Sequence, residues 1–214
     1  MESHSTDMIG RIRQDLLYCL RWNVLPDLDN VEIATDPRHE EIVVPLLGSV
    51  LADESLASPP LGRLEVCIEE CWGKRSYDRA PNEYRYQPLP SLVIDTRDGR
   101  SIILKEFVTQ VHIYLIHHIE ETKKVKGELY GELREQEDGT KVRTITYGRP
   151  YLPPNIRIFF KRRWTTARND DVIPSVSLFV EGEHDWSFDK FRAIQMNHAR
   201  VHQQERQGLN LSFS

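Results

Sequence analysis

The sequence contains few cysteines, and their spacing excludes the common cysteine sites. Three cysteines occur in 214 residues, and Cys67 and Cys71 lie four apart, which is not the spacing of a redox or zinc pair. An odd number of cysteines without a framework is typical of a reducing compartment, so we expect a cytoplasmic or nuclear protein. Cys67 lies in an apolar run and is interpreted as a core residue, with a cysteine nucleophile as the less favoured reading.

The sequence also lacks long apolar runs and the common catalytic and cofactor motifs. No run approaches the roughly 18 apolar residues that cross a bilayer. The opening residues have neither the basic region nor the apolar core of a signal peptide. No Gly-x-Ser-x-Gly, P-loop or dinucleotide fingerprint is present. We therefore expect no membrane segment and no cofactor.

An excess of positive charge is missing as well. The chain has 28 basic and 33 acidic side chains, a formal net charge of −5, which argues against a general nucleic-acid binder. One local basic segment, residues 157–168, contains Arg162 and Arg163 among aromatic residues. Arginines and aromatic rings together are typical of contacts with a partner or with single-stranded nucleic acid. A solvated basic face is the simpler interpretation.

What the sequence does contain is a strongly apolar segment over residues 104–122. Its apolar residues recur at the spacing of one helix face, and Ile113 and Ile116 fall outside that face, which predicts a helix covered on two sides. We expect this helix to lie buried at the centre of the core. The predicted stripe consists of Leu104, Phe107, Val108, Val111, Leu115, His118 and Ile119.

Strand patterns surround this helix. Asp98-Gly99 and Asp138-Gly139 each predict a hairpin turn between flanking strands, and residues 175–181 predict a strand. Alternation over residues 61–72 favours a strand, although helical spacing also fits, and residues 156–164 fit a helix or a strand equally. The pattern predicts an α+β fold with a mixed or antiparallel sheet packed against the central helix.

About four helices are expected in total, and they suggest the domain organisation. Amphipathic runs predict helices near both ends, over 8–22 and 189–207, and a helix over 40–51 that Pro45 kinks or divides. We predict an N-terminal helical extension over 1–23 and an α+β core over 24–183. The C-terminal helix and tail occupy 184–214.

A loop insertion is predicted over residues 73–91, where prolines and polar residues break regular structure. Long loops in compact domains are often functional. The loop carries Tyr77, Tyr84 and Tyr86, which makes it a candidate contact surface, although the tyrosines of a surface insertion also pack on one another.

Two short motifs resemble a domain of unknown function found in uncharacterised fungal proteins. They are the segment 56–61, Leu-Ala-Ser-Pro-Pro-Leu, and the helix entry formed by Gly99, Ile102, Glu106, Phe107 and Val108. The resemblance covers residues 24–180 and implies an intracellular α+β domain of a fungus. It implies no catalytic residues, and the loop over 73–91 and the hairpin after the central helix depart from the family pattern.

The histidines supply the remaining candidate sites. On the central helix, His117 and His118 lie close to Glu121 and form a candidate acid/base group, although His118 on an apolar stripe is more typical of a core histidine. His198 and His202 lie one turn apart, as a metal pair requires, with Glu205 three residues further on. Solvent-exposed histidines are the favoured interpretation there, because only His184 is near enough to serve as a third histidine.

The sequence therefore favours a non-catalytic binding or interaction module with an unidentified protein partner or a second copy of the chain. The predicted contact residues are Tyr77, Tyr84, Tyr86, Arg162 and Arg163. A small cofactor-independent enzyme of fungal specialised metabolism, using His117 or His118, is the alternative, and a weak nucleic-acid binder is the third hypothesis. An enclosed pocket with a converging histidine and carboxylate would favour an enzyme.

Overall fold

A computed structural model describes residues 10–78, 81, 83–129, 132–135, 137, 141–144, 156–162, 166–168, 171–183 and 186–211. The α-helices are α2 (Gln14–Cys19), α3 (Glu69–Tyr77), α4 (Leu104–His117), α5 (Ile119–Leu129) and α6 (Phe188–Leu211). The strands are β1 (Leu20–Arg21), β2 (Glu32–Ala34), β3 (Val43–Pro45), β4 (Arg63–Ile68), β5 (Leu92–Asp95), β6 (Glu132–Glu135), β7 (Lys141–Thr144), β8 (Ile158–Arg162), β9 (Thr166–Arg168), β10 (Asp171–Ile173) and β11 (Ser175–Val180).

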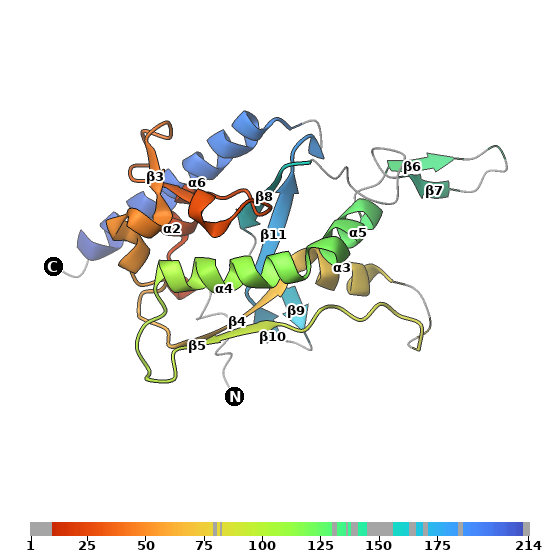
Figure 1. The fold of residues 1–214 in the computed structure, drawn as a ribbon, viewed down its shortest axis with the longest axis horizontal. Helices are drawn as coiled ribbons and strands as arrows, with labels where there is room; N and C mark the ends of the chain where they lie inside the picture. Colours follow the sequence, from red (N-terminus) through yellow and green to blue (C-terminus); the bar gives the residue numbers. More distant parts are fainter. Residues whose placement is uncertain are drawn as a thin grey trace.

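The core is a four-stranded mixed sheet with the order β5-β4-β11-β8. β4 and β11 run parallel, and the two outer pairs are antiparallel. All six residues of β11 are buried, because apolar side chains cover both faces of this inner strand. Figure 1 shows α4 crossing in front of the sheet and the β6–β7 hairpin extending away from the body. The predicted α+β class is confirmed.

A separate antiparallel sheet, β1-β2-β3, follows α2 and packs into the same hydrophobic core. Here the predicted helix over 40–51 is wrong. The chain instead forms β3 and two short 3₁₀ helices, η2 (Leu46–Gly48) and η3 (Val50–Asp53). Pro45, which has no N–H to donate, ends β3 and precedes η2, and the Ser49 side chain caps η3.

The predicted helix over 104–122 is present as two helices, α4 and α5, that meet at His118. Thr122 Oγ1 donates to the His118 carbonyl at 2.9 Å, a side-chain bond that often bends helices. The α5 axis turns away from α4 at this point (Figure 1). The predicted cover on two sides is wrong, because Ile113 is 64% exposed and Ile116 is 39% exposed. The predicted stripe through Leu115 is buried.

The two segments with ambiguous periodicity are now assigned. Residues 61–72 contain both alternatives in turn, since β4 passes directly into α3. Residues 156–164 contain the strand β8, which pairs with β11 along one edge. On its other edge, Phe160 N donates to Trp22 O at 2.9 Å.

The two predicted hairpins have different outcomes. β6 and β7 pair as predicted, with Asp138-Gly139 outside the described residues. After β5, Gly99 adopts a positive φ of 73° in the predicted turn. The predicted hairpin is wrong, however, because β5 pairs with β4 and Ile103 forms a bridge with Ser55 instead of with β5.

Candidate functional site

A pocket of about 320 Å3 lies where the beginning of α2 meets the C-terminal half of α6. We call it the α2–α6 pocket. Its volume is at the low end of the range for small-molecule sites. It is lined by Gly10, Arg11, Ile12, Arg13, Gln14, Asp15, Ser58, His202, Glu205 and Arg206.

The two helices are joined by a buried arginine. Arg192 of α6 donates to the backbone carbonyls of Tyr18, Cys19 and Leu20 at 3.3, 2.9 and 2.7 Å. These carbonyls end α2 and have no partner within that helix, so the guanidinium caps α2 and fixes it against α6. The polar residues of both helices are thereby held at one place.

An ion network forms one wall of the α2–α6 pocket. Asp15 accepts hydrogen bonds from Arg13 at 2.7 Å and from Arg206 at 3.3 Å, and Arg13 also pairs with Glu54 at 3.0 Å. The guanidinium of Arg13 therefore donates its hydrogen bonds to two carboxylates, those of Asp15 and Glu54. Arg206 binds Asp15 only through Nη1, which leaves its Nε and Nη2 without a partner in the described chain.

Arg11 contributes a second set of donors. Its Nε and Nη2 donate to the Pro59 and Pro60 carbonyls at 2.7 to 3.3 Å. No described residue accepts from Nη1. The carbonyls orient the guanidinium without neutralising it, because they carry no net charge. Arg11 and Arg206 thus offer the lining a positive charge and unused N–H groups.

His202 occupies the wall formed by α6. Its Nδ1 lies 2.9 Å from Glu205 Oε2, and its ring stacks on Tyr18 with a centroid distance of 5.7 Å. His198 stacks on the same tyrosine at 5.0 Å. Both imidazole rings therefore pack against the Tyr18 ring. Among the described residues no group of three or more metal-ligating side chains is placed to hold a metal ion, and His184 lies outside them.

The pocket contains one hydroxyl, but not an assembled nucleophile. Ser58 shares the lining with His202, yet no hydrogen bond joins its hydroxyl to the imidazole in the described structure. Acyl transfer requires that contact between nucleophile and base.

The candidate acid/base group on the central helix is divided by the break at His118. His117 is exposed, and its ring packs edge-on against His118, which in turn packs against Tyr114. Burial, together with the neighbouring His117, lowers the pKa of His118. Glu121 is half-buried on α5, and the described structure contains no hydrogen bond between it and either histidine.

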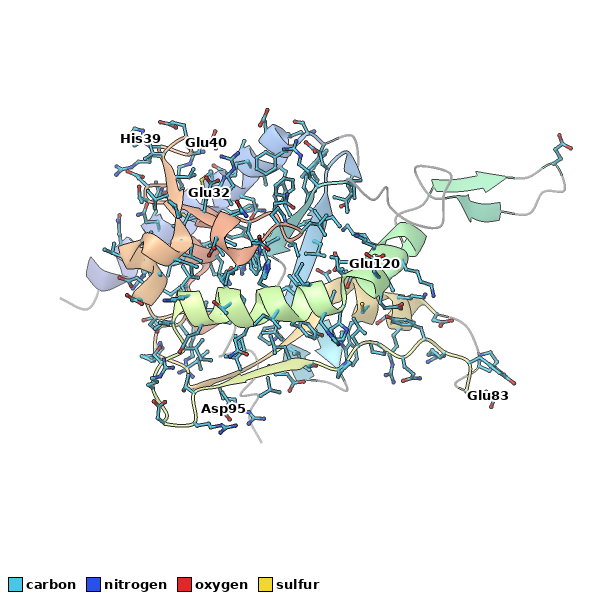
Figure 2. All side chains as sticks on the ribbon, viewed as in Figure 1. Glu32, His39, Glu40, Glu83, Asp95 and Glu120 are labelled. Atoms are coloured by element: carbon cyan, nitrogen blue, oxygen red, sulfur yellow. The ribbon has the colours of Figure 1, made fainter. Side chains whose placement is uncertain are left out.

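The predicted partner-binding residues that the structure describes have different neighbours: Tyr86 lies beside Lys74, and Arg162 lies beside Tyr18. In the segment after α3, Tyr84 is 76% exposed, whereas Tyr86 is half-buried with Lys74 Nζ 4.6 Å from its ring centroid. Figure 2 shows the neighbouring Glu83 far from the body of the molecule. The Tyr77 side chain lies outside the described residues.

The described arginines of the basic segment differ in exposure: Arg157 is exposed and pairs with Glu181, whereas Arg162 is half-buried. Arg162 lies 4.7 Å from the centroid of the Tyr18 ring, and burial lowers the pKa of its guanidinium to about 10. Arg163 lies outside the described residues. Arg162 is therefore a packing residue beside the stack that holds His202.

The three cysteines are buried, and none of them forms a disulfide. Burial raises the pKa of the Cys71 thiol to about 11 and that of Cys19 to about 12. Since the thiolate is the nucleophile, neither thiol is activated at neutral pH.

One charged cluster was missed in the sequence. Glu70 of α3, Lys126 of α5 and Glu183 after β11 form a buried group that we call the closed cluster. Lys126 Nζ lies 3.3 Å from Glu70 Oε1 and 3.1 Å from a Glu183 oxygen, and only 3% of the lysine side chain is exposed. In the sequence Lys126 is one of three nearby lysines, and nothing there separates it from Lys124, which the structure leaves exposed.

The closed cluster replaces a missing strand at the edge of β11. β4 ends at Ile68, so Leu178 has no neighbouring strand on that side. The Leu178 N–H donates to Glu70 Oε1 at 2.9 Å, the Leu178 carbonyl accepts from Lys126, and Ser177 Oγ donates to Glu70 at 2.8 Å. The cluster thus satisfies backbone groups that would otherwise be buried without partners.

Comparisons with known proteins gave no match to a family model, a curated protein or a solved structure. The resemblance to a fungal domain therefore stays a prediction. Among the helices that the structure describes, none has the length and apolar character to span a membrane.

Proposed function

We propose that this protein is a non-catalytic binding module whose α2–α6 pocket receives an anionic group of its ligand. The observation that carries the proposal is the pair of guanidinium groups with unused N–H donors, Arg11 and Arg206, on one small cavity. Charge-assisted hydrogen bonds from arginine to a carboxylate or phosphate are the strongest that side chains make.

The lining has three arginines against Asp15 and Glu205, and Glu54 also pairs with Arg13, so the guanidinium that no carboxylate neutralises is that of Arg11, whose partners are uncharged carbonyls. Asp15 is already paired with Arg13, so it competes weakly for the unused donors of Arg206. The pocket therefore attracts an anion without requiring that a buried ion pair be broken first.

The absence of a nucleophile–base contact among the described residues supports binding over catalysis. Ser58 and His202 are not hydrogen bonded, and Cys71 and Cys19 are protonated thiols. Tyr84 remains a predicted contact for a protein partner, since an exposed tyrosine at the end of a long segment is typical of interaction surfaces.

The test is calorimetric titration with succinate at low ionic strength, where electrostatic screening is weak. The wild-type protein should bind, and the Arg11→Gln/Arg206→Gln variant should bind at least about tenfold more weakly, as expected for lost charged hydrogen bonds. Arg200→Gln is the matched control, because Arg200 is exposed on α6 and does not line the pocket.

Two results would contradict the proposal. One is an absence of binding by the wild-type protein. The other is an equal loss of affinity in the Arg200→Gln control, which would show only a general effect of net charge. Thermal melting of each variant confirms that the fold is retained.

A further inference from the structure

His202 is the one histidine among the described residues that line the α2–α6 pocket. Histidine is the side chain whose charge ordinarily changes between pH 5 and 8, whereas carboxylates and guanidinium groups ordinarily keep their charges over that range. The side chain of His202 is 32% exposed, so its ring can exchange a proton with water. The charge of the pocket therefore depends on pH through this residue.

The contact between His202 and Glu205 is compatible with both charge states of the ring. His202 Nδ1 lies 2.9 Å from Glu205 Oε2. A carboxylate accepts a hydrogen bond from the Nδ1–H of a neutral imidazole and from that of an imidazolium alike. Proton uptake at the other ring nitrogen therefore requires no rearrangement of the pair. It converts a hydrogen bond that leaves the charge of Glu205 in place into an ion pair that cancels this charge.

A count of charges shows what proton uptake does to the pocket. With a neutral His202 the charges balance, because three guanidinium groups meet three carboxylates, two on the lining and one beside it. The guanidinium groups belong to Arg11, Arg13 and Arg206, and the carboxylates belong to Asp15, Glu205 and Glu54. A protonated His202 leaves an excess of one positive charge. An anion in the pocket would compensate it.

The remaining groups around His202 come from α2, β8 and α6. Its ring stacks on Tyr18 of α2, and Arg162 of β8 lies 4.7 Å from the centroid of the same tyrosine ring. Tyrosine and arginine side chains do not ordinarily change charge between pH 5 and 8. On α6, Arg206 follows His202 by four residues and so lies on the same face. His198 also stacks on Tyr18 but does not line the pocket, which makes it an internal reference.

Resting on the proposed function, we propose that anion binding in the α2–α6 pocket is coupled to proton uptake by His202, so that the protein binds its anionic ligand more tightly as the pH falls. The coupling is reciprocal, because an anion near the ring favours the imidazolium and the imidazolium raises the affinity for the anion by the same factor. An opposite charge within about 4–6 Å favours a charged side chain by about tenfold or more. The ligand is released as the pH rises.

The experiment is calorimetric titration of the full chain with succinate at pH 6.5 and at pH 8, at equal and low ionic strength. Succinate is almost entirely ionised at both values, whereas histidine is about half protonated at the lower one. The wild-type protein should bind succinate about threefold to fivefold more tightly at pH 6.5, which is part of the roughly tenfold coupling. The heat of binding at pH 6.5 should also differ between two buffers of different ionisation enthalpy, because the complex takes up a fraction of a proton.

Two variants assign the proton. His202→Gln keeps a polar side chain beside Glu205 but does not titrate, so its affinities at the two pH values should be equal and proton uptake should vanish. His198→Gln is the matched control, because His198 lies off the lining, and it should keep the full pH dependence. In the wild-type protein at pH 7, nuclear magnetic resonance should show the ring signals of His202 moving toward those of the protonated form as succinate is added. Those of His198 should move much less.

The outcomes separate the two proposals. Equal affinity at the two pH values in the wild-type protein, or a pH dependence that persists in His202→Gln, would overturn the coupling and leave the anion pocket standing. Movement of the His198 signals in place of those of His202 would also overturn it. If the wild-type protein binds no succinate at either pH, the proposed function fails together with this inference.

Discussion

The closed cluster and the α2–α6 pocket are both built on ion pairs, but the pairs differ in burial and have different consequences. In the closed cluster, Lys126 and Glu70 are almost fully buried, and their atoms complete the edge of β11. In the pocket, Arg206 pairs with Asp15 through one nitrogen and keeps its other donors unused at the surface. The buried ion pairs of the closed cluster complete the fold, whereas the partly exposed pair of Arg206 and Asp15 leaves N–H donors of Arg206 available to a ligand.

The largest effect is expected for Lys126→Met. This change removes the ammonium group that pairs with the buried carboxylate of Glu70, so the free energy of unfolding should fall by about 3–5 kcal/mol. Urea unfolding measures it. Lys124→Met, at an exposed position of the same helix, should change stability by less than about 0.5 kcal/mol. Equal losses in the two variants would show that the closed cluster does not stabilise the fold.

A somewhat smaller effect is expected for Arg192→Met. The carbonyls of Tyr18, Cys19 and Leu20 lose their donor, and the free energy of unfolding should fall by about 2–3 kcal/mol. Because Arg192 also fixes α2 against α6, succinate affinity should fall too. A destabilised variant with unchanged affinity would contradict the view that this arginine positions the pocket.

A pH dependence of stability is expected from His112. Trp22 Nε1 donates to His112 Nδ1 at 3.3 Å, and burial lowers the pKa of His112 from its ordinary value of 6.5. At pH values below 6.5 the unfolded chain binds a proton at His112 more readily than the folded protein does. The contribution of neutral His112 to stability is therefore fully present above pH 6.5 and is lost as the pH falls further. The urea midpoint should be lower at pH 5.5 than at pH 7.5.

His112→Gln is the control for this effect. Glutamine still offers an acceptor to Trp22 but does not titrate, so the difference between the two midpoints should shrink. A difference of the same size in the variant would assign the pH dependence to other groups.

The smallest effect is expected for Ile113→Ser on the outer face of α4. Since Ile113 is 64% exposed, the free energy of unfolding should change by less than about 0.5 kcal/mol. Leu115→Ala, on the buried face of the same helix, should cost about 2–5 kcal/mol. A large loss for Ile113→Ser would show that something covers this face in solution.

Helical periodicity predicted the core of α4 correctly but not its surroundings. Phe107, Val108 and Val111 are buried as the pattern indicated. The exposure of Ile113 and the break at His118 were not predicted, because they depend on which elements pack nearby and on the Thr122 side chain. Local apolar spacing identifies a buried face and does not reveal how many neighbours a helix has.

The pocket was beyond prediction from the sequence for a different reason. Arg11, Ser58 and Arg206 are far apart in the chain, and no spacing rule connects them. His202 and Glu205 were noticed as neighbours on one helix, but the exposed or metal-binding interpretations omitted Tyr18, which orients the ring. Tertiary packing of α2 on α6, through Arg192, brings these groups together.

The most direct test of the anion pocket is a nuclear magnetic resonance titration that follows the arginine Nε–H signals of the full chain as succinate is added. The signals of Arg11 and Arg206 should shift together and saturate, while that of Arg200 stays in place. Saturable shifts that spare Arg11 and Arg206, or no shifts at all, would contradict the proposed anion pocket.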